Sequence, residues 1–375
     1  MPAIFERIDM EPKLAFTMPL DGNCLTNKAG VLSEDQKSLL ITVSLAAPAG
    51  QEIFVNGSKA KYKDGCYRAT VPLTAYQNTV MATTDTGDTC SMTVYWLPRA
   101  TNCYRLSLDD NIRFLEDLAA HKDTYRSIFE NPYLAILKEA HERFGTKIHA
   151  NLFYHGVKEN GFTLSDMPDT FKAEFEANAS WLHFSFHAKG EFPDRPYIDA
   201  DYQKVDNDLS QVCREIARFA GEKVLDHSET TIHWGECSRE GTKALHDRGL
   251  RILAGFLIWN KKQDSGLVSY FLDRDTILQS AHYGIHKDKN SDMIFSKIDV
   301  ILNTGTKESL LAKLEEDYAK YPMKGFWEFL MHEQYFYPDY AKYLPDFRER
   351  IFAALAWAEE KGLTPAFLSE THLEA

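Results

Sequence analysis

Ionisable side chains follow four apolar segments of the chain, at the point where each segment ends. The four endings are Ser107-Leu108-Asp109-Asp110-Asn111, Phe184-Ser185-Phe186-His187, His233-Trp234-Gly235-Glu236 and Met331-His332-Glu333-Gln334. Carboxylates and imidazoles transfer protons and bind divalent metals in enzymes. If the segments are parallel strands of one barrel, their C-terminal ends meet on one face. The residues that we expect to line one pocket there are Asp109, Asp110, His187, His233, Glu236, His332 and Glu333.

Each ending also has a structural interpretation that involves no chemistry. Asp and Asn residues cap helix N-termini, so Asp109-Asp110-Asn111 could serve the helix that follows. His187 could be a hydrogen-bonded structural histidine, and the other two endings could be loop pairs. The recurrence of ionisable groups at the ends of four apolar segments favours the shared pocket.

His183 and His187 lie four residues apart, a spacing that brings two imidazoles to one face of a helix. Their segment, WLHFSFHA, has the composition of a strand. Along an extended strand the two residues are about 13 Å apart, so they cannot bind one ion. We therefore expect His187, at the end of the strand, to be a candidate metal ligand and His183 not to share its ion.

Strand-like and helical segments alternate from Cys103 onward. Helical spacing of apolar residues appears in segments such as NIRFLEDLAAH and DLSQVCREIARFAG, and strand-like segments such as KIHANLFYH separate them. This alternation predicts a parallel sheet, and the number of units predicts closure. We expect an α/β fold over residues 100–375, an irregular (β/α)7-8 barrel whose closure is incomplete or irregular.

Residues 1–99 have a different pattern. Short runs in which apolar and polar residues alternate are separated by residues that favour turns. Asn56-Gly57 is a strong hairpin signal, and Asp64-Gly65 is a second turn pair. Strands at this spacing predict a small β-sandwich. The pattern resembles the immunoglobulin-like modules found beside carbohydrate-active domains.

Composition excludes some partners. The 375 residues carry a formal net charge of −13, which repels the phosphates of nucleic acids. No apolar stretch is long enough to cross a membrane. The N-terminus lacks the apolar core of a secretory signal, and the six cysteines show no CxxC pairing. We expect a cytoplasmic protein with reduced thiols, and the oligomeric state cannot be read from the sequence.

Asp109-Asp110 after an apolar strand resembles the Ser/Thr-Phe-Asp-Asp-Gly motif of the polysaccharide deacetylase superfamily. The resemblance covers roughly residues 103–370 and implies that Asp109 is the catalytic base and Asp110 a metal ligand. Leu330-Met331-His332 resembles the family's Leu-x-His motif, which implies that His332 is the general acid. The chain also looks like a group of bacterial proteins that carry the segments SLDDN, SFHA, HWGE and HEQYFYPDY.

Two family motifs are altered in this chain. The family's His-Ser/Thr-x-x-His motif corresponds to residues 187–191, where His187 matches the first ligand and Glu191 stands in place of the second histidine. The Arg-x-Pro-Tyr motif has no match, and the segment from His233 to Glu236 occupies its place.

The resemblance implies a carbohydrate-active hydrolase that removes acetyl groups from a sugar, or cleaves a related amide or ester. Asp110 and His187 would bind a divalent metal, with Glu191, His233 or His332 as a third ligand. Zinc suits this set, and manganese, nickel, cobalt or iron also fit it. The metal would activate water and polarise the carbonyl group. The aromatic residues that would face the sugar ring are Trp234, Tyr335 and Tyr337.

Two alternatives remain open at this stage. A glycoside hydrolase without metal would use Asp109 with Glu236 or Glu333 as its acid and base, which requires carboxyl groups about 5–10 Å apart. A non-catalytic carbohydrate-binding protein would use the β-sandwich for binding. Metal analysis distinguishes the first alternative from the deacetylase, and the effect of Asp109→Asn on turnover and binding tests the second.

Overall fold

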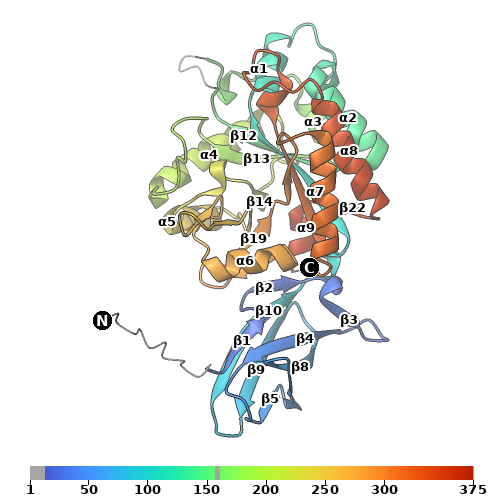
Figure 1. Cartoon of the computed structure of the whole chain (residues 1–375). Coiled ribbons are helices and arrows are strands. Elements are labelled where there is room, and N and C mark those ends of the chain that lie inside the picture. The colour runs from blue at the N-terminus through green and yellow to red at the C-terminus, as the bar shows by residue number, and fades with distance from the viewer. Residues whose placement is uncertain (1–12, 157–160, 375) are drawn as a thin grey trace, which may run out of the picture.

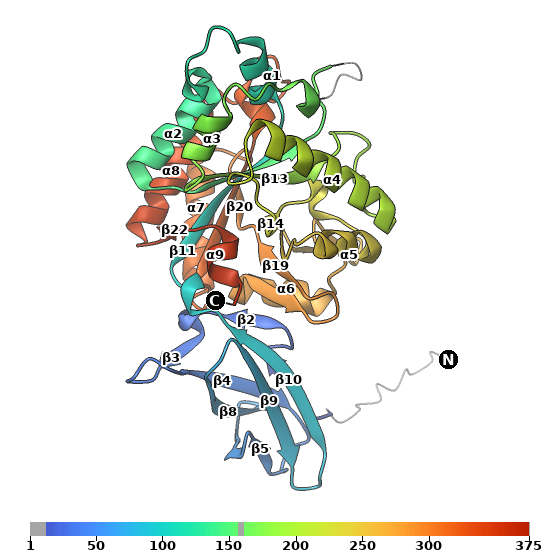
Figure 2. The same cartoon turned by 180° about the vertical axis from the view of Figure 1, so that it is seen from behind.

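The computed structural model describes residues 13–156 and 161–374. A β-rich N-terminal part (residues 13–96) lies at one end of the molecule, and a larger α/β part (residues 103–374) makes up the rest (Figure 1). Figure 2 shows the same arrangement from behind. The mixed α/β class expected from the sequence is confirmed.

The N-terminal part consists of two groups of strands that share one apolar core. The first sheet contains β1 (Ala15–Met18), β3 (Gly30–Leu32), β4 (Leu39–Ala46), β7 (Lys61–Lys63) and β8 (Cys66–Leu73). The second group contains β2 (Asn23–Leu25), β5 (Ile53–Val55), β6 (Ser58–Lys59), β9 (Gln77–Thr84) and β10 (Thr89–Trp96). Side chains along β4 alternate between buried and exposed, so Val43 of one group and Val80 of the other meet in the same core.

Five parallel strands hold most of the site, in the order β13-β12-β11-β21-β20. They are β11 (Cys103–Asn111), β12 (Ile148–Phe153), β13 (Leu182–Ala188), β20 (Val300–Ile301) and β21 (Phe326–His332), and β22 (Thr364–Pro365) joins β11. A second parallel group contains β14 (Glu229–Thr230), β15 (Ile252–Gly255) and β19 (Met293–Lys297). A small hairpin of β16 (Ile258–Asn260) and β17 (Ser265–Leu267) follows β15.

The strand ladders of the described residues do not close into a barrel. Strands β13 and β14 belong to different sheets, and the isolated bridge Phe184↔Leu225 joins β13 to the segment that precedes β14. The second opening lies between β19 and β20, which belong to different sheets. Only two residues join these strands, too few for the helical crossover that keeps parallel strands adjacent. The incomplete closure expected from the sequence thus takes the form of two openings between separate parallel groups.

Helices cover the parallel strands. They are α1 (Arg113–Ala120), α2 (Pro132–Phe144), α3 (Lys172–Ala177), α4 (Tyr202–Phe219), α5 (Arg239–Asp247), α6 (Arg274–Tyr283), α7 (Lys307–Lys320), α8 (Phe347–Glu360) and α9 (Leu368–His372). In α2, Asn131 caps the N-terminus, Pro132 occupies the first turn and Gly145 ends the helix at a φ of 66°. Their apolar faces build the main core with the strands.

One sheet runs through both parts of the molecule. Strand β2 pairs in parallel with β10 and antiparallel with β18 (Ile285–Asp288), which in turn pairs with β19. A small core that includes Tyr95, Ile285 and Leu368 fills the junction. None of the helices in the described ranges is long and apolar enough to cross a membrane.

Candidate metal centre

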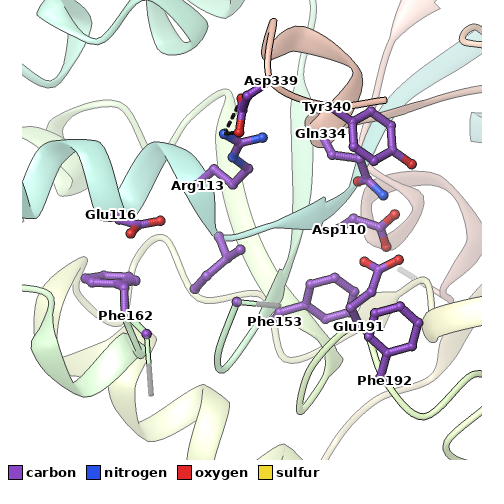
Figure 3. Close-up of a pocket in the computed structure, with 13 residues that line it drawn as sticks. Asp110, Arg113, Glu116, Phe153, Phe162, Glu191, Phe192, Gln334, Asp339 and Tyr340 are labelled. Carbon is purple, nitrogen blue, oxygen red and sulfur yellow. Dashed lines mark hydrogen bonds and ion pairs between the residues drawn. The ribbon is translucent and has the colours of Figure 1, made fainter. Parts of the chain in front are cut away.

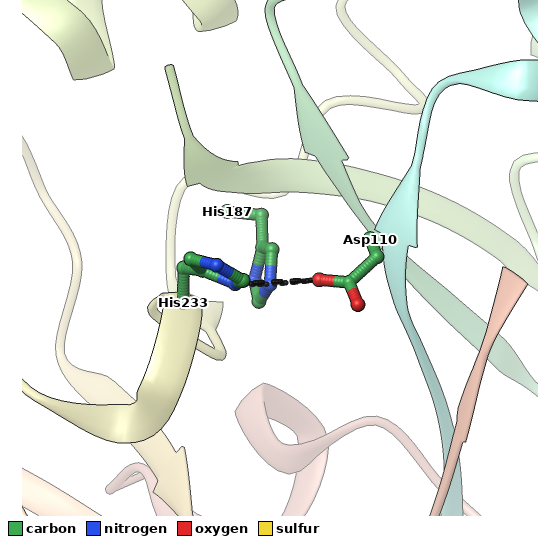
Figure 4. Close-up of side chains that lie close together, drawn as sticks. All are labelled: Asp110, His187 and His233. Carbon is green, nitrogen blue, oxygen red and sulfur yellow. Dashed lines mark hydrogen bonds and ion pairs between the residues drawn. The ribbon is translucent and has the colours of Figure 1, made fainter. Parts of the chain in front are cut away.

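Three ionisable side chains meet where the parallel strands end: Asp110, His187 and His233 (Figure 4). The Nε2 atom of His187 lies 3.1 Å from Oδ1 of Asp110. The Nδ1 atom of His233 lies 3.1 Å from this Nε2 atom and 3.3 Å from the same Oδ1 atom. All three side chains are buried. The site thus draws one residue from β11, one from β13 and one from the segment after β14.

A bulge in β11 positions Asp110. In the ladder with β12, Leu108 pairs with Ala150 and Asn111 pairs with Leu152, so Asp109 and Asp110 together face the single residue Asn151. Asp110 has a φ of 60°, a left-handed conformation that is strained for a residue with a Cβ atom. The bulge explains how two adjacent carboxylates serve one site although strand neighbours normally point to opposite faces.

A second bulge, in β13, positions His187. Leu152 and Phe153 of β12 pair with Phe186 and Ala188, which leaves His187 without a counterpart. His233 lies in a tight turn, His233–Gly235, where Trp234 and Gly235 have φ values of 64° and 55°. Each of the three side chains therefore sits on or beside irregular backbone, which is characteristic of functional sites.

The hydrogen bonds of the two imidazoles assign their tautomers. Nδ1–H of His187 donates to the backbone carbonyl of Thr231, which leaves the Nε2 lone pair facing Asp110. Nε2–H of His233 donates to the backbone carbonyl of Glu191 at 3.3 Å, which leaves the Nδ1 lone pair facing the same point. With this pair of tautomers, two nitrogen lone pairs and a carboxylate oxygen converge on one point. A bound cation would satisfy this arrangement.

The separations within the cluster fit a single ion. Two ligand atoms that each lie about 2.0–2.1 Å from one tetrahedral zinc ion are about 3.3 Å apart. The three separations are 3.1, 3.1 and 3.3 Å. Backbone carbonyls that hold the outer N–H groups are the partners that metal-binding histidines use. The residues present therefore fit a divalent metal.

His332 stands beside the cluster at a greater distance. Its Nδ1–H donates to Oδ1 of Asn303 at 2.8 Å, and its Nε2 atom lies 3.9 Å from Oδ2 of Asp110. The side chain is 24% exposed, whereas that of His187 is 2% exposed. His332 can therefore exchange protons with solvent more readily than the other two histidines.

The charges of the cluster perturb its pKa values. Burial alone would raise the pKa of Asp110, but His332, His187 and His233 outweigh this effect and hold it well below the usual range. Burial would lower the pKa of His187, but Asp109 and Asp110 raise it. The surrounding imidazoles therefore favour an ionised Asp110 carboxylate.

Asp109 is buried next to the cluster and is held by two donors. Its Oδ1 atom accepts hydrogen bonds from Nδ2 of Asn151 at 2.6 Å and from Oγ of Ser107 at 3.2 Å. In the β11–β21 ladder Asp109 lies opposite His332. The Asp109 carboxylate on β11 and the His332 imidazole on β21 thus belong to residues that pair on neighbouring strands, next to Asp110.

A cavity of about 460 Å³ opens in front of the cluster (Figure 3). Asp110 lies at one end, and the carboxylate of Glu191 points toward it. Burial, followed by the charge of Asp110, raises the pKa of Glu191 to about 7. The aromatic residues that line the cavity are Phe153, Phe162, Phe192 and Tyr340. The volume is that of a small-molecule site.

Glu333 and Tyr337 are engaged in a structural role. The Glu333 carboxylate accepts hydrogen bonds from the backbone N–H groups of Ile112, Arg113 and Phe114, at the N-terminus of α1. The Tyr337 hydroxyl donates to Glu333 at 2.8 Å, and its ring lies 3.9 Å from the Arg113 guanidinium. The structure therefore does not bring Glu333 to the centre of the cavity.

Glu236, Trp234 and Tyr335, also expected from the sequence, are not among the residues that line the cavity. Oε2 of Glu236 lies 3.5 Å from Nε of Arg195, and burial raises the pKa of this carboxyl although Arg195 lowers it. Trp234 is 42% exposed beside His233. Tyr335 packs against His332 and Tyr340, with ring centroids 6.1 and 5.1 Å away.

A second buried group, His149, Asp226 and Glu229, lies near the opposite ends of the strands. The Nε atom of Arg105 lies 3.1 Å from Oε1 of Glu229, and Nη2 of Arg105 lies 2.6 Å from Nδ1 of His149. Arg105 and His183 already pair with the two carboxylates of this group, and we interpret it as a salt-bridge network rather than a metal site.

Sequence reasoning missed Asn151, Thr231 and Asn303, which orient the ionisable residues. Asn151 sits in the middle of an apolar strand, where a polar residue signals a buried hydrogen-bond network. Thr231 acts through its backbone carbonyl, which no side-chain pattern reveals. Asn303 lies two residues after the end of β20, so the position of polar residues near strand ends could have identified it.

Comparison with known proteins finds no matching family model and no matching curated sequence. Solved structures with some similarity include a CE4 family pseudoenzyme from Bacillus anthracis, at 13% identity and a TM-score of 0.37, over 72% of this chain and 65% of that chain. This chain thus spans less than two thirds of that protein. A family 4 acetyl xylan esterase from Clostridium thermocellum in complex with a cobalt ion has 10% identity and a TM-score of 0.36, over 72% and 89%. 4-alpha-glucanotransferase from Thermococcus litoralis has 12% identity and a TM-score of 0.43, over 72% and 40%. At these scores the likeness establishes neither family nor activity.

Proposed function

We propose that the protein is a divalent-metal-dependent hydrolase that removes acetyl groups from a carbohydrate or cleaves a related amide or ester. The observation that carries this proposal is the convergence of the lone pairs of His187 and His233 on the Asp110 carboxylate, with both ring N–H groups turned outward. Zinc is the first candidate, and manganese, nickel, cobalt and iron also suit this donor set. When bound, such an ion lowers the pKa of water and polarises a carbonyl group.

The chain's own residues supply proton transfer. Asp109, held on one oxygen by Asn151 and Ser107, is the proposed base that takes a proton from water. His332, whose Nδ1–H is fixed by Asn303, is the proposed acid that donates from Nε2 to the leaving group. Glu191 faces the cavity rather than serving as the third ligand, a place that the geometry offers to His233.

The aromatic walls of the cavity suit the apolar face of a sugar ring. Phe153, Phe162, Phe192 and Tyr340 provide these walls, and the exposed Trp234 extends the aromatic surface outside the cavity. The proposed roles of Tyr335 and Tyr337 change accordingly, since Tyr335 supports Tyr340 and Tyr337 supports the start of α1.

The test is acetate release from N-acetylglucosamine oligomers and acetylated xylo-oligosaccharides by protein loaded with zinc. We expect turnover that stops when a chelator removes the metal and returns when zinc is added. Asp109→Asn should lower turnover by about 10²- to 10⁴-fold, the usual contribution of a general base. Absence of acetate release from every acetylated probe by zinc-loaded protein would contradict the proposal.

One observation favours a second candidate, a glycoside hydrolase that needs no metal. Glu191 and Asp110 face each other across the cavity, with the pKa of Glu191 raised to about 7 and that of Asp110 lowered. Two carboxyl groups whose pKa values are pushed apart form an acid and nucleophile pair in glycosidases. Release of reducing sugar by chelated protein, abolished by Glu191→Gln, would support this candidate.

A further inference from the structure

The side-chain amide of Asn151 connects four strands at the base of the site. Asn151 is fully buried in β12 and is the residue that faces the β11 bulge. Its Nδ2 group donates to Oδ1 of Asp109 at 2.6 Å and to Oγ of Ser107 at 3.0 Å. The proposed base is therefore fixed by an amide that belongs to the neighbouring strand.

The oxygen of the same amide fixes the opposite side of the site. Oδ1 of Asn151 accepts from the hydroxyl of Ser185 at 2.7 Å, the hydroxyl of Thr230 at 3.1 Å and the backbone N–H of Thr231 at 3.2 Å. The backbone carbonyl of Thr231 is the acceptor for Nδ1–H of His187. One amide thus holds both Asp109 and the residue that sets the tautomer of His187.

We propose that Asn151 is a positioning residue that couples the proposed base to the metal-binding histidine, so that Asp109 and His187 keep a fixed relation to one another. The two halves of the amide have separate tasks. The Nδ2 donor orients Asp109, and the Oδ1 acceptor holds Thr231 and through it the lone pair of His187. A carboxamide is required because a carboxylate has no donor for Asp109 and an apolar side chain has neither group.

This inference rests on the proposed function for the role of Asp109, and two variants separate its halves. Asn151→Asp keeps an acceptor for Thr231 but places an oxygen against Asp109. We expect it to retain the zinc affinity of the wild type and to lose acetate release by at least 100-fold through kcat, with KM unchanged. Asn151→Leu removes both functions, and we expect zinc affinity to fall about 10- to 100-fold, the usual effect of losing a partner that orients a ligand.

Thr146→Ala is the matched control, because it removes one buried hydrogen bond, to the hydroxyl of Tyr104, that involves neither Asn151 nor its partners. We expect it to leave zinc affinity and turnover at the wild-type level. Zinc affinity is measured by calorimetry on metal-free protein, and ¹⁵N-edited NMR of labelled histidine reports the tautomer of His187. The wild type should show a slowly exchanging Nδ1–H on His187, and this signal should weaken in Asn151→Leu and persist in Asn151→Asp.

Three results would overturn the inference: unchanged zinc affinity and His187 signal in Asn151→Leu, full turnover in Asn151→Asp, or losses in Thr146→Ala equal to those in the Asn151 variants. If Asn151→Leu fails to fold, NMR of the wild type still tests the inference, which requires that the side-chain amide protons of Asn151 are protected from exchange. Rapid exchange of these protons would contradict it. If the wild type binds zinc but releases no acetate, the proposed function fails while the affinity and NMR measurements still test Asn151.

Discussion

At the scale of single residues, the direction of each imidazole N–H decides what the cluster can bind. His187 and His233 both turn their N–H groups toward backbone carbonyls, and both lone pairs face the carboxylate of Asp110. His332 makes the same kind of outward hydrogen bond, to Asn303, but its inward nitrogen lies 3.9 Å from Asp110. This difference in distance and in exposure separates the two proposed metal ligands from the proposed general acid.

His332→Gln should therefore impair catalysis more than metal binding. We expect kcat to fall by about 10²- to 10⁴-fold, as for loss of a general acid, while zinc affinity falls less than about tenfold. His233→Gln is the matched comparison and should lose zinc affinity by more than about 100-fold, since it removes a ligand itself. Calorimetry and acetate-release kinetics measure the two effects. Equal losses of zinc affinity in both variants would make His332 a ligand.

At the scale of elements, helix α1 begins at a buried carboxylate. Its N-cap residue, Ile112, offers no side-chain acceptor, and Glu333 from another segment satisfies the free N–H groups of the first turn. A negative charge there also interacts favourably with the helix dipole. Glu333 therefore secures the helix that directly follows Asp110.

Glu333→Gln should lower the free energy of unfolding by about 1.5–3 kcal/mol, because charged hydrogen bonds in a buried site become neutral ones. Urea denaturation of the metal-free protein measures this change. Glu116→Gln, an exposed residue in the same first turn, should change stability by less than about 0.5 kcal/mol. If Glu333→Gln has the stability of the wild type but loses turnover, Glu333 has a catalytic role rather than a structural one.

Helix α9 carries a histidine that must stay neutral. His372 is fully buried, its Nε2 atom lies 3.2 Å from the hydroxyl of Ser296, and burial together with the charge of Arg105 lowers its pKa to about 3. The unfolded chain binds a proton on this histidine below a pH of about 6.5, and the folded chain does so only below about 3. Stability from this group is therefore present above about pH 6.5 and is lost as the pH falls toward 3.

His372→Gln should weaken this acid sensitivity. A single such group contributes a slope of about 1.4 kcal/mol per pH unit between the two pKa values, and the neutral amide removes it. Denaturant titrations of both proteins at pH 4, 5, 6 and 7 measure the slope. Identical pH dependence in the wild type and the variant would show that His372 does not set it.

At the scale of the whole molecule, a continuous sheet joins the two parts. Strand β2 bridges β10 and β18, and Arg99 donates from Nη2 to the backbone carbonyl of Leu373 at 2.6 Å. The junction core contains Tyr95 from one part and Ile285 from the other. Separating the parts would expose this core and the edge of β18, so each part depends on the other.

The two parts should therefore unfold together. Hydrogen exchange of backbone amides, followed by mass spectrometry at increasing urea, should give the same midpoint for peptides from β9–β10 and from β21, since each midpoint reports the stability of its own cooperative unit. Two well-separated midpoints would show independent units and would contradict a structural role for the shared sheet.

Residue periodicity predicts the mixed α/β class because apolar spacing differs between strands and helices. It does not predict where the barrel opens. The two positions depend on the shortness of β14 and on the direct link between β19 and β20. The continuous sheet through β2 also escapes prediction, because strand pairing between distant segments leaves no local pattern.

The position of ionisable residues at strand ends predicts a common site, and the structure brings Asp110, His187 and His233 within hydrogen-bond distance of one another. The two bulges that aim Asp110 and His187 inward have no sequence signature here. The sequence also does not show that Glu333 binds the backbone N–H groups of α1. These groups come from a distant segment, and Glu333 stands at a strand end beside His332, as a site residue would.

The central claim, that Asp110, His187 and His233 hold one divalent metal, is tested most directly by calorimetric titration of zinc into metal-free wild type, Asp110→Asn, His187→Ala and His233→Gln. We predict that one zinc ion binds per wild-type chain. The zinc affinity of each variant should be at least about 100-fold lower, because each substitution removes one of three converging ligands. Equal affinities in the four proteins, or no binding to the wild type, would contradict this claim.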